Sequence, residues 1–182
     1  NMKYKDLQVT QTDDGCLCNI TDNAADAKIT GIESELQWVV TDDLLVFGAV
    51  TLLETEYEDF VDSNGLDNSG NELQRTPNYQ FNVGGEYTSD FMGHTDALTL
   101  RLTYSHQGKL YWLPDNFQHE DAYGLLDGRI TFAPQDADWS VSLWGKNIAD
   151  ELYRTNIIAF LGDEVSTLGA PRTYGISLGY KF

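Results

Sequence analysis

The chain has 182 residues, 29 acidic against 11 basic side chains and a net charge of −18. This length suits one domain, and the acidic balance excludes a nucleic-acid-binding surface, because phosphates require basic partners. No run approaches the roughly 18 consecutive apolar residues that a membrane-spanning helix needs, whereas 16 glycines, 10 tyrosines and only 4 prolines favour strands and turns. The first residues look like a strand rather than a signal peptide, so we expect either a mature chain or a piece of a longer protein.

Alternation of apolar and polar side chains predicts eight strands. Their predicted ranges are 3–10, 27–39, 44–57, 78–88, 97–107, 122–132, 139–155 and 171–182. In the second strand, Glu33 and Glu35 face away from Trp38. A dry core on the carboxylate side would be costly, so we expect water there. In the third strand, one shared face carries Leu45, Phe47, Ala49, Thr51, Leu53 and Tyr57.

The connections between the predicted strands alternate in length. Long polar segments occupy 12–26, 58–75, 110–121 and 156–170, whereas the turns at 41–43, 89–95 and 133–138 are short. In an antiparallel meander, alternate connections lie at opposite ends of the sheet, so one end carries every long loop. Transmembrane barrels have this arrangement, with short periplasmic turns and long extracellular loops, and a Greek-key sandwich gives no reason for it. We therefore predict an all-β, antiparallel, up-and-down transmembrane β-barrel segment of about eight strands.

The last strand has the clearest alternation, and it predicts which sides face lipid and water. Its apolar face carries Tyr174, Ile176, Leu178, Tyr180 and Phe182, opposite a small or polar face, which fits lipid on one side and a wet lumen on the other. Aromatic residues at strand ends are predicted to form the interfacial girdles: Tyr57, Tyr79, Tyr87, Tyr104, Tyr153, Tyr174 and Phe182. Charged residues on the predicted lumen face are interpreted as a solvated wall held by ion pairs, in preference to a specific binding site: Glu33, Glu35, Arg101, Asp127, Arg129 and Lys181.

Two C-terminal stretches carry a family resemblance. The first matches an N-(I/L)-x-D-x-x-Y segment through Asn147, Ile148, Asp150 and Tyr153. The second matches a Pro-Arg-x-(Tyr/Phe)-Gly pattern through Pro171, Arg172, Tyr174 and Gly175. Together with the strands at 27–57 and 75–87, their order and spacing make essentially the whole chain resemble the TonB-dependent receptors, the gated outer-membrane transporters for siderophores, vitamins and other scarce nutrients.

The resemblance implies a fold, a location and a set of partners. Family members form 22-stranded barrels plugged by an N-terminal domain, so the chain would be the C-terminal part of such a barrel in the bacterial outer membrane. Its own plug domain and the region that engages TonB would be absent from it. The other implied partners are membrane lipid and lipopolysaccharide, the barrel-assembly machinery and a small-molecule substrate. The implied function is TonB-dependent uptake of a ferric siderophore, a vitamin or a glycan, with no enzyme activity and no cofactor.

The resemblance also implies a terminal assembly signal, read by the barrel-insertion machinery. The residues expected to carry it are Tyr174, Leu178, Tyr180 and Phe182. The family usually has glycine five residues before the final aromatic, and Ser177 stands there instead.

Four chemical patterns in the sequence have simpler explanations, and none predicts a catalytic or metal site. Gly175, Ser177 and Gly179 spell the G-x-S-x-G pattern of hydrolases, but that chemistry needs a strand-to-helix turn and later acid and histidine partners. The three histidines lack metal-ligand spacing: His94, His106 and His119. The acidic loop fails the EF-hand pattern at Leu66, which favours a solvated loop over calcium. Cys16 and Cys18 favour a loop disulfide or two ordinary thiols over a metal site.

Four loop aromatics are the best candidates for ligand contact: Tyr111, Trp112, Phe117 and Phe160. Extracellular loops above a barrel mouth meet substrate first, but the same rings can instead pack one loop against another. Two other classes stay open for the chain as a whole. One is a complete eight-stranded outer-membrane barrel with a structural or adhesive role, and the other is a soluble β-sandwich.

Overall fold

The computed structural model describes the backbone of residues 1–13, 15, 18–160 and 163–182. Side chains are described within these ranges except at 11–13, 18–19, 22–25, 158–160 and 163–164. None of the described residues belongs to a helix long and apolar enough to cross a membrane. The strands are β1 (Met2–Asp13), β2 (Cys18–Thr41), β3 (Leu44–Asp59), β4 (Tyr79–Phe91), β5 (His94–Gln107), β6 (Leu110–Tyr111), β7 (His119–Glu120), β8 (Tyr123–Phe132), β9 (Trp139–Lys146), β10 (Arg154–Phe160), β11 (Asp163–Leu168) and β12 (Thr173–Tyr180).

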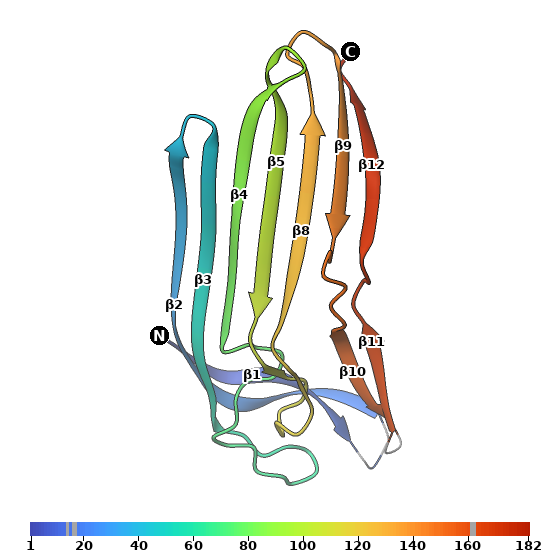
Figure 1. The fold of residues 1–182 in the computed structure, drawn as a ribbon. Coiled ribbons are helices and arrows are strands. Elements are labelled where there is room, and N and C mark those ends of the chain that lie inside the picture. The colour runs from blue at the N-terminus through green and yellow to red at the C-terminus, as the bar shows by residue number, and fades with distance from the viewer. Residues whose placement is uncertain (14, 16–17, 161–162) are drawn as a thin grey trace.

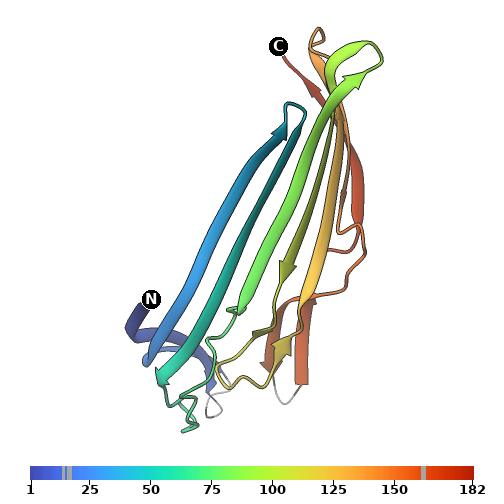
Figure 2. The ribbon, with the colours of Figure 1, turned by 60° about the vertical axis from the view of Figure 1, so that its left-hand side comes forward.

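Eight of these strands form one antiparallel sheet in the order β1-β2-β3-β4-β5-β8-β9-β12. They correspond one to one to the eight predicted strands, so the prediction of an all-β antiparallel meander is confirmed. Figures 1 and 2 show the sheet as one tall, curved wall. The wall is not closed into a barrel, because among the described residues β1 pairs only with β2, and β12 pairs only with β9.

Short turns and long loops lie at opposite ends of the wall, as the alternating connection lengths predict. Residues 42–43, 92–93 and 133–138 turn the chain at the end that holds the C-terminus (Figure 1). The segments 60–78, 108–122, 147–160 and 163–172 lie at the other end, which we call the mouth. The mouth also holds two small additional sheets, formed by β6 with β7 and by β10 with β11.

The outward face of the wall is apolar and uncovered. The register places Leu102 opposite Gly128 and Leu143 opposite Ile176, and alternate residues of neighbouring strands therefore share this face. Large apolar side chains exposed on it are Ile32, Leu36, Trp38, Val50, Leu52, Val83, Leu100, Leu102, Ile130, Leu143, Ile176 and Leu178. Soluble monomers rarely expose so extended an apolar patch, whereas a lipid-facing sheet requires one.

The other face of the wall is the lumen face. One of the two faces of β3 belongs to it, and alternation in the sequence alone does not show which one. Phe47 lies on it, and the Arg101 guanidinium sits 4.5 Å from the centre of the Phe47 ring. The same guanidinium pairs with Glu86 at 3.1 Å across β4 and β5. Both faces of β3 are apolar, so alternation alone groups its residues without telling which group meets lipid.

Aromatic side chains gather on the outward face next to the short turns. The Phe132 ring contacts the rings of Phe91 and Trp139, with centroids 5.6 and 5.7 Å apart. Tyr180 contacts Phe182 in the same way at 5.2 Å. Aromatic rings at this level match the aromatic girdle at one membrane interface.

Two residues predicted for the girdles lie elsewhere. Tyr57 is 1% exposed and lies in a buried cluster at the mouth. Tyr153 stacks on Tyr123 with ring centroids 4.6 Å apart. Both predictions are wrong. Tyr57 lies where segments of the mouth fold over the inside of the wall, and Tyr153 lies beyond the end of β9, where the chain has left the wall. Neither side chain therefore faces lipid.

Two predicted boundaries at the mouth are also wrong. The polar segment 12–26 is not an open loop, because β1 pairs with the first half of β2 as a long hairpin. Such a ribbon is solvated and shows no apolar alternation.

Strand β9 ends at Lys146 instead of 155, because Asn147 adopts a left-handed φ of 48° and turns the chain out of the sheet. The following segment forms the β10–β11 hairpin.

The small residues on the lumen face of β12 accommodate one large neighbour from β9. The Trp144 indole lies over Gly175, where a Cβ would come within 2.5 Å of the ring. The indole N–H donates to the Ser177 hydroxyl at 3.1 Å. Serine at this position therefore has a structural partner that glycine would lack.

Replacing Trp144 by phenylalanine is expected to destabilise the pairing of β12 with β9 by about 1 kcal/mol, because the ring contact stays and one hydrogen bond is lost. Denaturant unfolding of the intact protein in detergent would measure the change. Ser177→Ala should have a similar effect, and the two substitutions together should cost no more than either alone. Fully additive effects would show that the two side chains do not interact.

Candidate functional site

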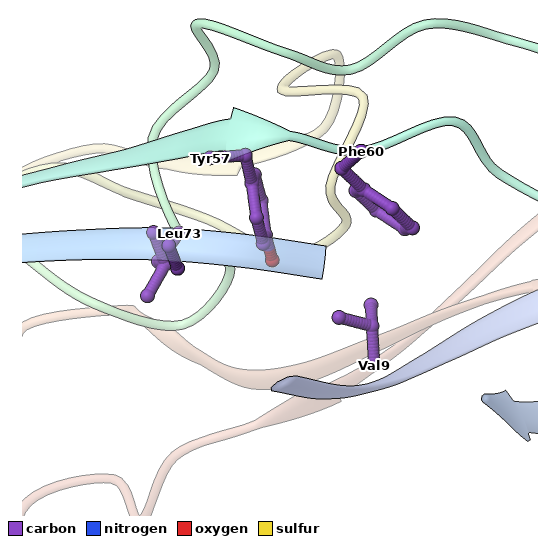
Figure 3. Close-up of a cluster of buried hydrophobic side chains, with 5 residues drawn as sticks. Val9, Tyr57, Phe60 and Leu73 are labelled. Carbon is purple, nitrogen blue, oxygen red and sulfur yellow. The ribbon is translucent and has the colours of Figure 1, made fainter. Parts of the chain in front are cut away.

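The first part of the mouth is a buried cluster that holds the β1–β2 hairpin inward. Val9 of β1 points toward the rings of Tyr57 and Phe60 at the end of β3, with Leu73 beside them (Figure 3). Tyr57 pairs with Ala27 on the lumen side of the wall, so the hairpin packs over the inside of the mouth. Burial raises the pKa of the Tyr57 hydroxyl.

The long loops of the mouth are joined by backbone and side-chain hydrogen bonds. Asn116 donates its side-chain amide to the Glu72 carbonyl at 2.9 Å and accepts from the Glu72 N–H at 2.8 Å. Asn71 donates to the Pro114 carbonyl at 2.9 Å. Arg75 reaches Asn156 of β10 at 3.1 Å. Segments far apart in the chain therefore form one connected rim.

An ion pair and a second apolar cluster tie β10 to the rim. Leu110, Trp112 and Ile157 are buried together. Glu120, whose side chain is 9% exposed, pairs with the Arg154 guanidinium and also accepts from the Arg154 backbone N–H at 3.0 Å. The guanidinium donates further to the His119 carbonyl at 2.7 Å. Both Glu120 oxygens are therefore engaged, which fixes the base of the β10–β11 hairpin.

The acidic loop after β3 uses its carboxylates to shape its own turns. Asp62 accepts from the backbone N–H groups of Asn64 and Leu66 at 2.9 and 2.8 Å. Hydrogen bonds from the Ser69 hydroxyl and N–H lower the pKa of Asp67. Among the residues with described side chains, no group of three or more His, Cys, Asp or Glu could hold a metal ion.

Below the rim, the lumen face is hollowed. A depression of about 360 Å³ is lined by the lumen-facing residues Ala49, Thr51, Gln80, Asn82, Ser105, Gln107, Tyr123 and Leu125, and it also borders Phe81 and His106, whose register positions face outward. Most of these lumen-facing side chains are polar and uncharged, unlike the Glu86–Arg101 pair nearer the short turns. The depression is open to the lumen and can accept a polar molecule or another polypeptide surface.

The structure separates the predicted ligand-contact aromatics. Phe117 is 82% exposed at the rim, beside a shallow hollow of about 170 Å³ that also involves His119 and Arg154. Tyr111 is half-buried, with the Lys109 ammonium 4.4 Å from its ring centre. Trp112 is 4% exposed and packs within the rim. The side chain of Phe160 lies outside the described residues, as does Cys16 with the side chain of Cys18.

Several rim residues gave no signal in the sequence. Asn116, Glu120 and Arg154 act across 34 to 44 residues of chain, and ordinary polar residues in loops carry no pattern that predicts such partners. In the structure Asn116 has a positive φ of 55°, a conformation that asparagine tolerates better than most residues, but the sequence alone does not show it.

The two C-terminal motifs meet in one structural unit, which we call the Asn147 clip (Asn147, Asp150, Glu151, Ala170 and Arg172). The Asn147 amide donates to the carbonyls of Glu151 at 2.9 Å and Ala170 at 3.1 Å, and its oxygen accepts from the Glu151 N–H at 2.8 Å. Asp150 accepts from the Arg172 N–H at 3.0 Å. The motifs are thus a single device that joins the exit from β9 to the start of β12.

Comparison with a family model shows to which protein family this chain belongs. The model of the TonB dependent receptor-like β-barrel family matches residues 1–148. The chain belongs to the TonB-dependent receptor family. Members of this family are outer-membrane barrel proteins and transporters, not enzymes, so the predicted family, location and non-enzymatic class are confirmed.

Solved TonB-dependent receptors have the same fold. The ferric yersiniabactin uptake receptor FyuA of Yersinia pestis is 23% identical with a TM-score of 0.83, covering 98% of this chain and 26% of that one. BauA, the ferric preacinetobactin receptor of Acinetobacter baumannii, is 23% identical with a TM-score of 0.71, and the match covers 96% of this chain and 26% of that one. The ferripyoverdine receptor of Pseudomonas aeruginosa is 25% identical with a TM-score of 0.64, and the match covers 87% of this chain and 20% of that one. The chain therefore spans between about a fifth and about a quarter of the length of these TonB-dependent receptors.

Proposed function

We propose that this chain is the C-terminal barrel segment of an outer-membrane receptor that takes up a ferric siderophore with energy from TonB. The observation that carries the proposal is the similarity over 87–98% of the chain to receptors named for ferric yersiniabactin, ferric preacinetobactin and ferripyoverdine. An apolar outward wall, a wet lumen face and a joined rim are the parts that such a receptor needs.

The proposed cargo contacts lie on the rim. Phe117 presents a free ring to the solvent above the mouth, and Tyr111 and Phe160 belong to the neighbouring segments β6 and β10. Trp112 supports them from below through its packing on Leu110 and Ile157. Aromatic rings give large contact areas at low entropic cost, which suits them to capture an amphipathic chelate.

The proposed partners follow from the surfaces of the wall. The hollowed lumen face would receive the receptor's own plug domain, through which TonB would act. The outward face would contact membrane lipid and lipopolysaccharide. Tyr174, Leu178 and Tyr180 project outward from β12 beside Phe182 and are exposed, so the barrel-assembly machinery could read them before the wall closes.

Uptake of radiolabelled cargo molecules by cells that carry the intact receptor as their sole candidate importer would test the proposal. Ferric hydroxamate, catecholate and carboxylate chelates would be compared with cobalamin and an oligosaccharide. We expect TonB-dependent uptake of at least one ferric chelate. Uptake of cobalamin or glycan alone would overturn the siderophore assignment, and no TonB-dependent uptake of any of them would overturn the transport assignment.

Phe117→Ala is expected to raise the half-saturating concentration of that chelate about 5- to 30-fold, as loss of one well-placed aromatic contact does. Met92→Ala is the matched control, because Met92 is similarly exposed, at 76%, but lies at the short-turn end. Equal uptake by both variants would remove Phe117 from the binding surface.

A further inference from the structure

A histidine lies between two tyrosines on the outward face near the mouth. The Tyr79 hydroxyl is 3.2 Å from Nε2 of His106, and the Tyr104 hydroxyl is 3.2 Å from Nδ1 of the same ring. The rings of Tyr79 and Phe81 stack on the imidazole with centroids 5.6 and 5.2 Å away. We call Tyr79, His106 and Tyr104 the outward triad.

The outward triad sits where the apolar band ends. Tyr79 pairs with Leu52, the last apolar residue on the outward face of β3. The next outward residues of β3 toward the mouth, Glu54 and Glu56, are exposed carboxylates, so water begins there. The triad therefore lies at the depth where hydrocarbon gives way to lipid headgroups.

Counting protons in the triad leaves a hydrogen-bond donor unused. A neutral imidazole has one N–H and one bare nitrogen, so it accepts from one tyrosine hydroxyl and donates to the oxygen of the other. The second hydroxyl proton then has no acceptor within the triad. A doubly protonated ring would donate to both tyrosines and leave both hydroxyl protons unused. In either state the triad offers at least one donor at the membrane boundary.

The rings are held in place, so this donor has a fixed position. Tyr104 lies over Gly124, where a Cβ would come within 2.1 Å of the Tyr104 hydroxyl. Gly124 thus leaves room for the tyrosine to lean across β8 without a clash. A fixed donor at this depth complements an acceptor-rich group, and phosphates are the strongest acceptors among membrane lipids.

We propose that the outward triad binds a phosphate of a lipid in the outer leaflet of the outer membrane, the phosphorylated lipid anchor of lipopolysaccharide. The hydroxyl that the imidazole does not use donates to a phosphate oxygen. The site lies on the lipid side of the wall; its place in the outer leaflet rests on the proposed receptor orientation, but not on the cargo proposed for the mouth.

The test uses the intact receptor in detergent, titrated with diphosphorylated lipid A, with lipid A stripped of phosphate, and with inorganic phosphate. EDTA is present throughout, so that a cation bridge through Glu54 is not measured. Thermal stabilisation reports binding. We expect stabilisation by diphosphorylated lipid A at concentrations at least about tenfold lower than those needed for the stripped lipid, a ratio of about 1.4 kcal/mol. Equal potency of the two lipids would overturn the proposal, and stabilisation by inorganic phosphate alone would show an adventitious ion only.

Removing both hydroxyls locates the site. The double variant Tyr79→Phe with Tyr104→Phe keeps every ring, so it should fold and should lose the preference for phosphorylated lipid. Tyr87→Phe is the matched control, because Tyr87 is another exposed outward tyrosine of β4 near the short turns. A preference that survives in the double variant would place phosphate recognition elsewhere.

Discussion

Replacing Asn147 by alanine is expected to lower the free energy of unfolding of the intact receptor by about 3 kcal/mol. Asn147 is 4% exposed, and three hydrogen bonds of its side chain join the end of β9 to Glu151 and Ala170. Each contributes roughly 0.5–1.5 kcal/mol, and the backbone groups left behind are also unsatisfied. The left-handed φ of 48° adds about 1 kcal/mol for alanine, which tolerates this region less well than asparagine.

Denaturant unfolding in detergent would measure the effect of Asn147→Ala. Asp150→Asn in the same clip is the graded comparison, because it removes the half-exposed ion pair of Asp150 with Arg172 but keeps a residue that tolerates the positive φ of 61°, so it should cost under about 1 kcal/mol. Asn82→Ala, on the exposed lumen face, should have little effect. If Asn147→Ala proved as mild as Asn82→Ala, the clip would not hold β12 to the chain that precedes it.

Replacing Glu120 by alanine is expected to destabilise the rim by about 2–3 kcal/mol, because it removes charge-assisted hydrogen bonds to Arg154, whose side chain is 33% exposed. Glu120 accepts from both the guanidinium and the backbone N–H of Arg154. The β10–β11 hairpin should then come loose from β7, since the other main contact at its base is the packing of Ile157 on Trp112.

Limited proteolysis of intact cells would detect the loosened hairpin of the Glu120→Ala variant as a new cleavage within 154–168. Removing both charges, Glu120→Ala with Arg154→Ala, should restore part of the stability, because no unpaired charge remains. Glu86→Ala is the control, since the Glu86–Arg101 pair is substantially more exposed and should cost under about 1 kcal/mol. Equal protease resistance of Glu120→Ala and Glu86→Ala would contradict the role of the buried pair.

The eight strands were predictable because alternation is imposed by the environment of the wall. Lipid on one side and water on the other select apolar and polar residues at every second position, as in the last strand from Tyr174 to Tyr180. The alternation of long and short connections followed directly from the meander. Where both faces are apolar, as in β3, the pattern cannot distinguish lipid from lumen, and the register with Glu86 and Arg101 was needed to assign Phe47.

The rim was not predictable to the same degree, because its contacts join residues far apart in the chain. Tyr57 and Trp112 are both aromatic residues at or beyond the end of a strand, yet both are buried by segments that fold over them. Whether a loop aromatic packs or projects depends on those segments, and Phe117 projects only because nothing described covers it. The Asn147 motif was recognisable as a resemblance, but its φ and its partners were not.

The central claim is that the mouth faces the outside of the cell and the short turns face the periplasm. Single cysteines in place of Phe117 and Met92, in an intact receptor whose Cys16 and Cys18 are replaced by serine, would be exposed to a membrane-impermeant maleimide. Phe117→Cys should react in intact cells, and Met92→Cys should react only after the outer membrane is permeabilised. Labelling of Met92→Cys in intact cells, with Phe117→Cys protected, would contradict the orientation and with it the assignment of the mouth to cargo capture.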